Sequence, residues 1–382
     1  MQIQTFYDLN IFIDDLNIFD APGVVFVRGE IYESITNPIP SCELELNVPT
    51  NWLDYRSIVD GTQIRFSLKS EQYNINNNYD FRIFNIKELS LQQRFAHIII
   101  EGVIDFYSGY ETGNTFNLNA PSSEIFKKVA STYGLNNEID ATNDLQTWVA
   151  GENNTYQFLN YMAEYGWIDE TSAMIWFIDR HKYLVYKNLT TLFRQRQDNI
   201  WIFKQTPDPN ISNKEYGYTG ASSSIQSGLE NLKNEGYGGT DKCFNLLTYS
   251  WDDIYARKVI AESNIINISK ELSKGLAQEW FPFNVGNNHA NFYKAYKQNK
   301  RILSTYSSYV TLQCQFFQPY RVGQIVNFEY LDSQYIHNKI IALSGVYIIN
   351  AIHISLSLKN ITATVELAMQ GLNGEAITRE VY

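Results

Sequence analysis

Adjacent acidic residues are the first groups in this chain that could perform acid–base chemistry. They occur at Asp14-Asp15, Asp169-Glu170 and Asp252-Asp253. General acid–base catalysis needs both carboxyl groups of a pair to reach the same reacting atoms. Neighbouring residues of a strand point to opposite faces of a sheet. These pairs are therefore poor candidates for a catalytic dyad, and we expect no catalytic residues among them.

The histidines and cysteines show no spacing typical of a metal site. The five histidines are at positions 97, 181, 289, 337 and 353, and the three cysteines, at 42, 243 and 314, are far apart. Zinc sites in proteins draw closely spaced Cys and His ligands from short motifs, so we expect no metal and no cofactor. For His353, in a predicted half-buried strand, a hydrogen-bonded structural role is favoured over a ligand role.

Two further polar stretches could be read as catalytic. The serines at 222–224 lack the strand–turn–helix context of a hydrolase nucleophile. Asp179-Arg180-His181 lies where a hairpin is expected to turn, and the sequence favours surface salt bridges there. Neither stretch predicts catalysis.

Composition narrows the class of protein. The chain has 382 residues, 15% of them aromatic, and a net charge of −11. A nucleic-acid surface needs clustered Lys and Arg, so this charge argues against one. The first residues lack the basic region and cleavable apolar stretch of a signal peptide. The longest apolar runs are far too short to span a bilayer. We expect synthesis in a cytoplasm and no stable membrane insertion.

The elements expected around these residues are mainly strands. Residues 1–118 alternate apolar and polar positions, as in "GVVFVRGEIYES" and "SCELELNV", which predicts a half-buried antiparallel sheet curled into a barrel or sandwich. Residues 119–190 predict two helices and a hairpin. In the first helix Ser122 or Ser123 could cap the start and Gly134 could end it in the left-handed conformation. The second helix, Thr155–Tyr165, would end by the same design at Gly166.

The rest of the chain divides into a second β region and a second insertion. The second β domain is expected to be discontinuous, over 191–245 and 304–372, with an insertion containing a helix at 246–303 and a tail at 373–382. Residues 217–240 are rich in Gly and Ser and predict a long loop.

Two regions of the chain share an order of elements. Gly61 precedes the strand "TQIRFSL" and Gly323 precedes "QIVNFEY"; in each case a linker, a long strand, a sharp reversal and a closing strand follow. Asn85 and Asn350 each stand five residues before a Ser–Leu pair. This order predicts duplication of one β domain, with two copies per chain.

Three stretches, in this order, make the chain resemble the baseplate hub protein of contractile-tailed bacteriophages. The first is "SSEIFKKVASTYGL" with "TWVAGENNTYQFLNYMAEYGWI", the second is "YGGTDKCFNLLTYSWDD", and the third is "PYRVGQIVNFEYL" with "SGVYIINAIHISLSLKNITATVELA". The same fold forms the N-terminal region of type VI secretion spike proteins and of tail-associated proteins in long-tailed phages. The matching positions are Trp148, Phe158, Gly166, Trp167, Gly323, Tyr347 and His353.

This resemblance implies a structural protein of the virion tail and no enzyme. It implies two tail-tube-like β-barrel domains per chain and a homotrimer whose six β domains form a pseudo-sixfold ring. One side of the ring would meet the hexameric tail tube or the tape-measure protein, the other the trimeric central spike. Other baseplate proteins would surround it, and DNA would pass through the channel without specific binding, helped by an acidic lining.

Two other classes of protein stay open at this point. One is a tail-associated peptidoglycan-degrading enzyme that uses acidic side chains in the α+β module. The other is a carbohydrate-binding tail adhesin, suggested by the Tyr and Trp content. Trp148 and Trp167 could accordingly anchor a partner, although core packing is the favoured interpretation.

Overall fold

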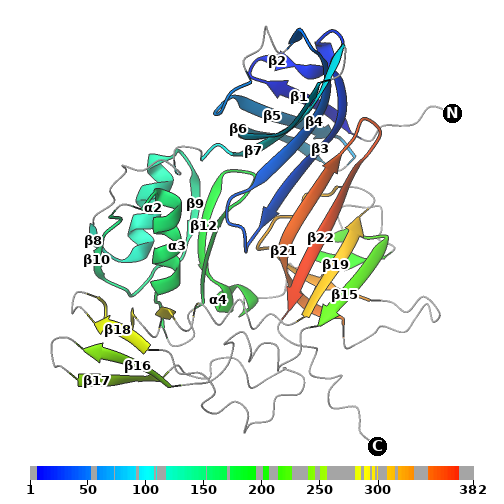
Figure 1. Ribbon diagram of the computed structural model, residues 1–382. Helices are drawn as coiled ribbons and strands as arrows, with labels where there is room; N and C mark the ends of the chain where they lie inside the picture. Colours follow the sequence, from blue (N-terminus) through cyan, green and yellow to red (C-terminus); the bar gives the residue numbers. More distant parts are fainter. Residues whose placement is uncertain are drawn as a thin grey trace, which may run out of the picture.

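The computed structural model is mainly β, with two long helices set beside the sheet (Figure 1). Among the described residues, no helix is both long and apolar enough to cross a bilayer. The described residues are 7–52, 58–72, 74–91, 94–106, 109, 118–151, 153–169, 173–194, 201–205, 214–225, 240–245, 250–255, 280–284, 288–292, 295–296, 299, 308–314, 317–330 and 343–369.

The first β unit is an antiparallel sheet in the spatial order β2-β1-β5-β6-β7-β4-β3. Alternate residues of β4 are buried, as the sequence pattern predicts, and Leu44, Leu46 and Val48 on the inner face are all fully buried. The strands are β1 (Asp8–Ile13), β2 (Leu16–Asn17), β3 (Val25–Ser34), β4 (Ser41–Pro49), β5 (Gln63–Ser70), β6 (Ile75–Leu91) and β7 (Phe95–Ile104).

The second β unit has the spatial order β15-β19-β22-β21-β20-β13-β14. Its strands are β13 (Trp201–Lys204), β14 (Glu215–Gly217), β15 (Gly220–Ile225), β19 (Ser308–Cys314), β20 (Ile325–Phe328), β21 (Gly345–Leu356) and β22 (Ile361–Met369). β15 lies inside the stretch that we expected to be a loop. Residues 226–239 of that stretch lie outside the described residues.

Both units belong to one open sheet of 14 strands, and within the described residues neither closes into the barrel that we expected. The reason is that β3, which ends the first unit, pairs along its outer edge with β21 of the second unit. Figure 1 shows β21 and β22 continuing directly from β3 and β4.

The first insertion is a compact α+β module. Helices α2 (Ser122–Thr132) and α3 (Thr155–Tyr165) pack on a small sheet formed by β9 (Asn136–Ile139), β11 (Met174–Ile178) and β12 (Tyr183–Asn188). β11 and β12 form the predicted antiparallel hairpin, and β9 joins β12 in parallel. A two-stranded ladder of β8 (Leu118–Ala120) and β10 (Gln146–Trp148) completes the module, and α4 (Leu189–Arg194) leads out of it.

The second insertion begins earlier in the chain than we expected. β16 (Thr240–Asn245), assigned above to the second β domain, pairs with β17 (Ser250–Tyr255) and β18 (Trp280–Asn284) in a separate sheet. Periodicity could not reveal this, because strand partners are set by tertiary contacts and not by the alternation within one strand. Of the expected helix in 246–303, the described residues at 292, 295–296 and 299 are helical.

Candidate functional site

The two β units repeat one backbone design around a turn glycine. Gly61 has a φ of +83° and Gly323 a φ of +80°, a conformation that glycine adopts without steric cost. The Gly61 N–H donates to the Ile83 carbonyl at 2.8 Å, and the Gly323 N–H donates to the Ile349 carbonyl at 2.9 Å. In each unit the residue after the glycine accepts a return bond, from Ile83 N–H to Thr62 and from Ile349 N–H to Gln324.

Strand order extends the repeat beyond the turn. β5, β6, β7, β4 and β3 are neighbours in that order in the first unit, and β20, β21, β22, β19 and β15 are neighbours in the same order in the second. The order along the chain is also the same. It is β3, β4, β5, β6, β7 in the first unit and β15, β19, β20, β21, β22 in the second, with β16 to β18 of the second insertion between β15 and β19. Over these five strands the chain therefore holds two copies of one connectivity, whereas β1 pairs with β5 antiparallel and β13 pairs with β20 in parallel.

The residue alignment of the two copies differs in part from the sequence comparison. Ser90-Leu91 and Ser355-Leu356 do occupy matching places, opposite His97-Ala96 and Thr362-Ile361. Asn85, however, matches Ala351 and not Asn350, because each lies directly after the first register shift of its strand. β6 has a second register shift between Ile86 and Glu88, and this extra residue moves the asparagines out of alignment.

The site that this repeat creates is the seam between the units, which we define as the ladder of β3 residues 29–34 with β21 residues 351–356. The pairing is antiparallel and unbroken from Ala351 opposite Ser34 to Leu356 opposite Gly29. The Ile35 N–H extends it by donating to the Asn350 carbonyl at 2.9 Å. The two units are thus hydrogen-bonded along a continuous backbone ladder.

One face of the seam is a closed apolar core. Ile31 on β3 and Ile352, Ile354 and Leu356 on β21 are at most 1% exposed. Gly29 lets the strands approach, because an added Cβ would lie 3.1 Å from the Phe66 ring and 3.3 Å from Leu356 Cδ1. Burial of these side chains stabilises the joint by about 1.5–3 kcal/mol per large residue.

The opposite face of the seam carries His353. Its ring stacks on Tyr32, the residue directly opposite it, with centroids 4.3 Å apart and an interplanar angle of 12°. We expected a hydrogen-bonded histidine. Instead, Nε2 is buried without a hydrogen-bond partner among the described residues and lies 3.7 Å from Glu30 Oε2. Stacking across the joint, which a single-strand pattern cannot reveal, replaces the expected bond.

The turn of the β11–β12 hairpin contacts both β units beside the seam through Arg180. Arg180 is 2% exposed, and its guanidinium donates to the Glu33 carboxylate of the first unit and to the Tyr320 carbonyl of the second. Its backbone N–H also donates to Glu33 at 3.1 Å. The guanidinium lies 5.2 Å from the Phe317 ring centroid. The expected surface salt bridge is wrong at Arg180, because both β units cover the turn.

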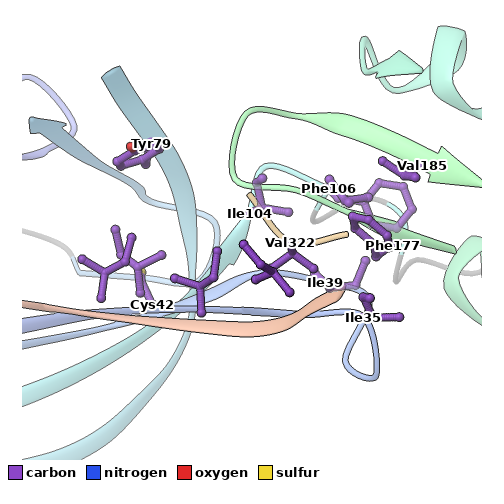
Figure 2. Close-up of a cluster of buried hydrophobic side chains, with 14 of the residues drawn as sticks. Ile35, Ile39, Cys42, Tyr79, Ile104, Phe106, Phe177, Val185 and Val322 are labelled. Atoms are coloured by element: carbon purple, nitrogen blue, oxygen red, sulfur yellow. The ribbon is translucent and has the colours of Figure 1, made fainter. Parts of the chain in front are cut away.

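Apolar side chains surround the same junction. Figure 2 shows Phe177 and Val185 of the hairpin beside Ile35 and Ile39 of the first unit and Val322 of the second, all of them buried. A Cβ added to Gly323 would lie 2.7 Å from the Phe177 ring. The first insertion therefore fixes the relative position of the two units.

The predicted motif residues of the first insertion lie in its core. Trp148 and Phe158 are fully buried and Trp167 is 4% exposed. Trp148 Nε1 donates to the Ala120 carbonyl at 3.0 Å. In the second unit Tyr347 is also fully buried, and its hydroxyl donates to the Leu343 carbonyl at 2.8 Å. These residues pack their own modules and present no surface to a ligand.

The two helix ends of the insertion differ from each other. Gly134 has a φ of +63°, and the following Leu135 N–H donates to the Ala130 carbonyl at 2.8 Å. Gly166 is extended, with φ −65°, so the expected left-handed end is wrong there. Gly166 is required for another reason: an added Cβ would lie 2.0 Å from the Tyr186 hydroxyl.

Helix α2 also starts differently from the prediction. Pro121 holds the N-cap position, and the cap comes from a distant residue that the sequence does not single out, Asp144. Its fully buried carboxylate accepts from Ser122 N–H at 2.8 Å, Ser122 Oγ at 2.6 Å and Trp167 N–H at 3.1 Å. Asp144 therefore ties the start of α2 to the end of α3.

A groove of about 540 Å³ between the first insertion and the second unit is a candidate for a catalytic or binding site. Its carboxylate, Glu138, accepts from Lys187 Nζ at 2.7 Å. Burial opposes ionisation of Glu138, but Lys187 and Arg321 together lower its pKa. A carboxylate held ionised suits an ion pair and not a general acid. In the described part of the chain, no three His, Cys, Asp or Glu residues are grouped as metal ligands.

The polar face of the first unit, continuous with the His353 side of the seam, is acidic. Glu30, Glu43 and Glu101 stand in one row across β3, β4 and β7, with Ser355 of β21 next in line. Arg28 Nη2 lies 3.2 Å from Glu43, and Lys87 Nζ lies 2.7 Å from the same carboxylate. These cations offset only part of the negative charge on this face.

The chain has the fold of phage tail proteins. No protein-family model and no curated relative matches it. A 43 kDa tail protein of prophage MuSo2 from Shewanella oneidensis has a TM-score of 0.58 at 11% identity, covering 94% of this chain and 98% of that one. A tail protein from Neisseria meningitidis has a TM-score of 0.55 at 9% identity, covering 96% and 98%.

A third solved structure extends the similarity to secretion machinery. An Escherichia coli component of the type VI secretion system, described as structurally similar to the bacteriophage T4 tail proteins gp27 and gp5, has a TM-score of 0.51 at 10% identity. The alignment covers 94% of this chain and 76% of that one. The resemblance stated from the sequence is therefore confirmed at the level of the fold.

Proposed function

We propose that this protein is the structural hub of a phage tail baseplate, or of a phage-derived injection machine. One observation carries the proposal: a single chain holds two β units that share the connectivity of five strands and are joined edge to edge through the seam. A homotrimer would then present six similar units. A threefold object of this kind can bind a sixfold tail tube on one side and a threefold central spike on the other.

The fold supports this role. Two neighbours that match over nearly their whole length are tail proteins, one of them from a prophage, and a third belongs to the type VI secretion system. We propose the central spike, the tail tube or tape-measure protein and the surrounding baseplate proteins as partners, and the virion tail as the location. The buried motif residues of the first insertion favour a structural module over an active site there.

In this assembly, the acidic face of the first unit would line the channel. Protein surfaces bind DNA by neutralising phosphates with Lys and Arg and releasing counterions. The row of Glu30, Glu43 and Glu101 would disfavour such contacts. DNA would then pass through the hub without specific binding.

Light scattering coupled to size-exclusion chromatography tests the proposal. Three chains of 44.2 kDa predict a particle of about 133 kDa, and the same sample should release no soluble fragments from peptidoglycan. A monomer that degrades peptidoglycan would replace the hub with an enzyme. Binding to a glycan array by a monomer would replace it with an adhesin.

A further inference from the structure

The second half of β6 has one hydrogen-bonding edge that no described strand covers. β5 pairs with residues 75–82 of β6, and β7 pairs with residues 81–91 along the other edge. Ile83 still bonds to Gly61 and Thr62 through its carbonyl and N–H, and beyond it the edge on the β5 side is open over the described residues. An open strand edge is a template for the addition of another strand.

The matching half of β21 in the second unit is covered. There β20 pairs with residues 345–348, and β3 takes over along the same edge at residues 351–356. This is the seam. The repeat therefore has a place for an added strand in both units, and the isolated chain fills only one of the two.

Side-chain burial shows the same difference. Ile352, Ile354 and Leu356 of β21 are at most 1% exposed. The residues at the same places in β6 are also apolar, but Ile86 is 40% exposed, Leu89 50% and Leu91 67%. Their pattern matches a buried seam, and their exposure indicates that a covering strand is absent from the single chain.

The repeat also identifies the covering strand. β3 covers β21, and the counterpart of β3 in the second unit is β15. Gly29 pairs with Leu44 of β4, and Ala221 pairs with Leu312 of β19, the match of Leu44. The outer edge of β15, opposite β19, is open among the described strands, and Ser222, Ser223 and Ser224 are exposed.

We infer that β15 of one chain adds antiparallel to the second half of β6 of the next chain. This inference rests on the proposed trimer and specifies its joints. Transferring the register of the seam places Ser90 opposite Ser222 of the neighbouring copy and Leu91 opposite Ala221 of that copy. The contact is head-to-tail, so it closes into a ring when joints within and between chains alternate.

A second copy of this chain fits the β6 edge better than an unrelated partner. The intrachain seam already shows the geometry that the intermolecular joint would reproduce, and the same chain carries both open edges. The residues of β15 at this position are small, with Ala221 in the place of Gly29.

Engineered disulfides test the register. In the Ser90→Cys/Ser222→Cys variant, opposed Cβ atoms in neighbouring strands come close enough for a bridge. Mild oxidation should link chains into covalent dimers and trimers on non-reducing gels. The matched control is Ser90→Cys/Ser224→Cys, two residues out of register on the same face, which should link far less. The two single-cysteine variants should stay unlinked.

A second variant probes the apolar contact. Leu91→Asp should abolish the trimer while leaving the thermal midpoint of the monomer unchanged, because Leu91 is already exposed in the chain. Leu145→Asp, on the first insertion with a similar 62% exposure, should leave the trimer intact.

The outcomes separate the two proposals. A wild-type trimer that persists in Leu91→Asp and gives no cross-link between positions 90 and 222 overturns the β15–β6 joint but leaves the hub. A wild-type monomer overturns the hub and the joint together. Equal cross-linking in both double variants overturns the register.

Discussion

Arg180 shows how burial changes the role of a residue. The sequence indicates a hairpin turn correctly, because Asp179 to Lys182 interrupt two apolar runs, but it gives no sign that both β units cover this turn. A buried charge must be paired, and here Glu33 pairs it. Tertiary neighbours, which lie about 140 residues away in the chain, decide between a surface and a buried arginine.

We predict that Arg180→Met destabilises the protein by about 3–5 kcal/mol, because it leaves the Glu33 carboxylate buried and unpaired. Urea unfolding measures the change. The double variant Arg180→Met/Glu33→Gln should recover part of the loss. Arg28→Ala, which removes exposed ion pairs from β3, should cost no more than about 1 kcal/mol. A loss equal to that of the Arg28 variant would refute the role of Arg180.

His181 beside Arg180 makes stability depend on pH. Burial, reinforced by the Arg180 charge, lowers the pKa of His181 from its ordinary 6.5 to about 4. Between these values the unfolded chain binds a proton that the folded chain does not, so the free energy of unfolding falls as the pH drops from 6.5 to 4. His181→Gln should flatten this slope in thermal melts, whereas His97→Gln should keep it. Unchanged slopes in both variants would contradict the assignment.

At the scale of elements, the first insertion was largely predictable and β15 was not. α3 has the bounds expected from apolar spacing and from the Gly that follows it. β15, with the sequence "GASSSI", has no apolar alternation, because it pairs with β19 by its backbone and exposes its serines. The start of α2 was also unpredictable, since its capping residue lies 22 residues away.

We predict that Asp144→Ala unfolds the first insertion more readily than the β sheet. The change removes the buried carboxylate that accepts from the backbone N–H groups of Ser122 and Trp167. Each buried group left without a partner costs about 1–3 kcal/mol. Hydrogen exchange should show faster exchange in α2 and α3 with the strands of the first unit unaffected. Glu124→Ala, an exposed change on the same helix, serves as the control and should leave exchange unchanged. Uniform acceleration across the sheet would argue against a separate role for Asp144.

At the scale of the whole molecule, the order of elements carried more information than any single motif. The repeated order of turn glycine, strand, long strand and closing strand is confirmed by the strand pairing, whereas within the described residues neither unit closes into the expected barrel. A repeat can be read from spacing along one chain. How its copies join depends on which edges remain open after folding, and that information is not local in sequence.

Projection images of the purified particle by electron microscopy test the central claim most directly. Views along the symmetry axis should show a ring with threefold symmetry whose wall contains six similar segments in alternating pairs around an open channel. A compact particle with one pair of segments, or a ring with twofold symmetry, would contradict the account.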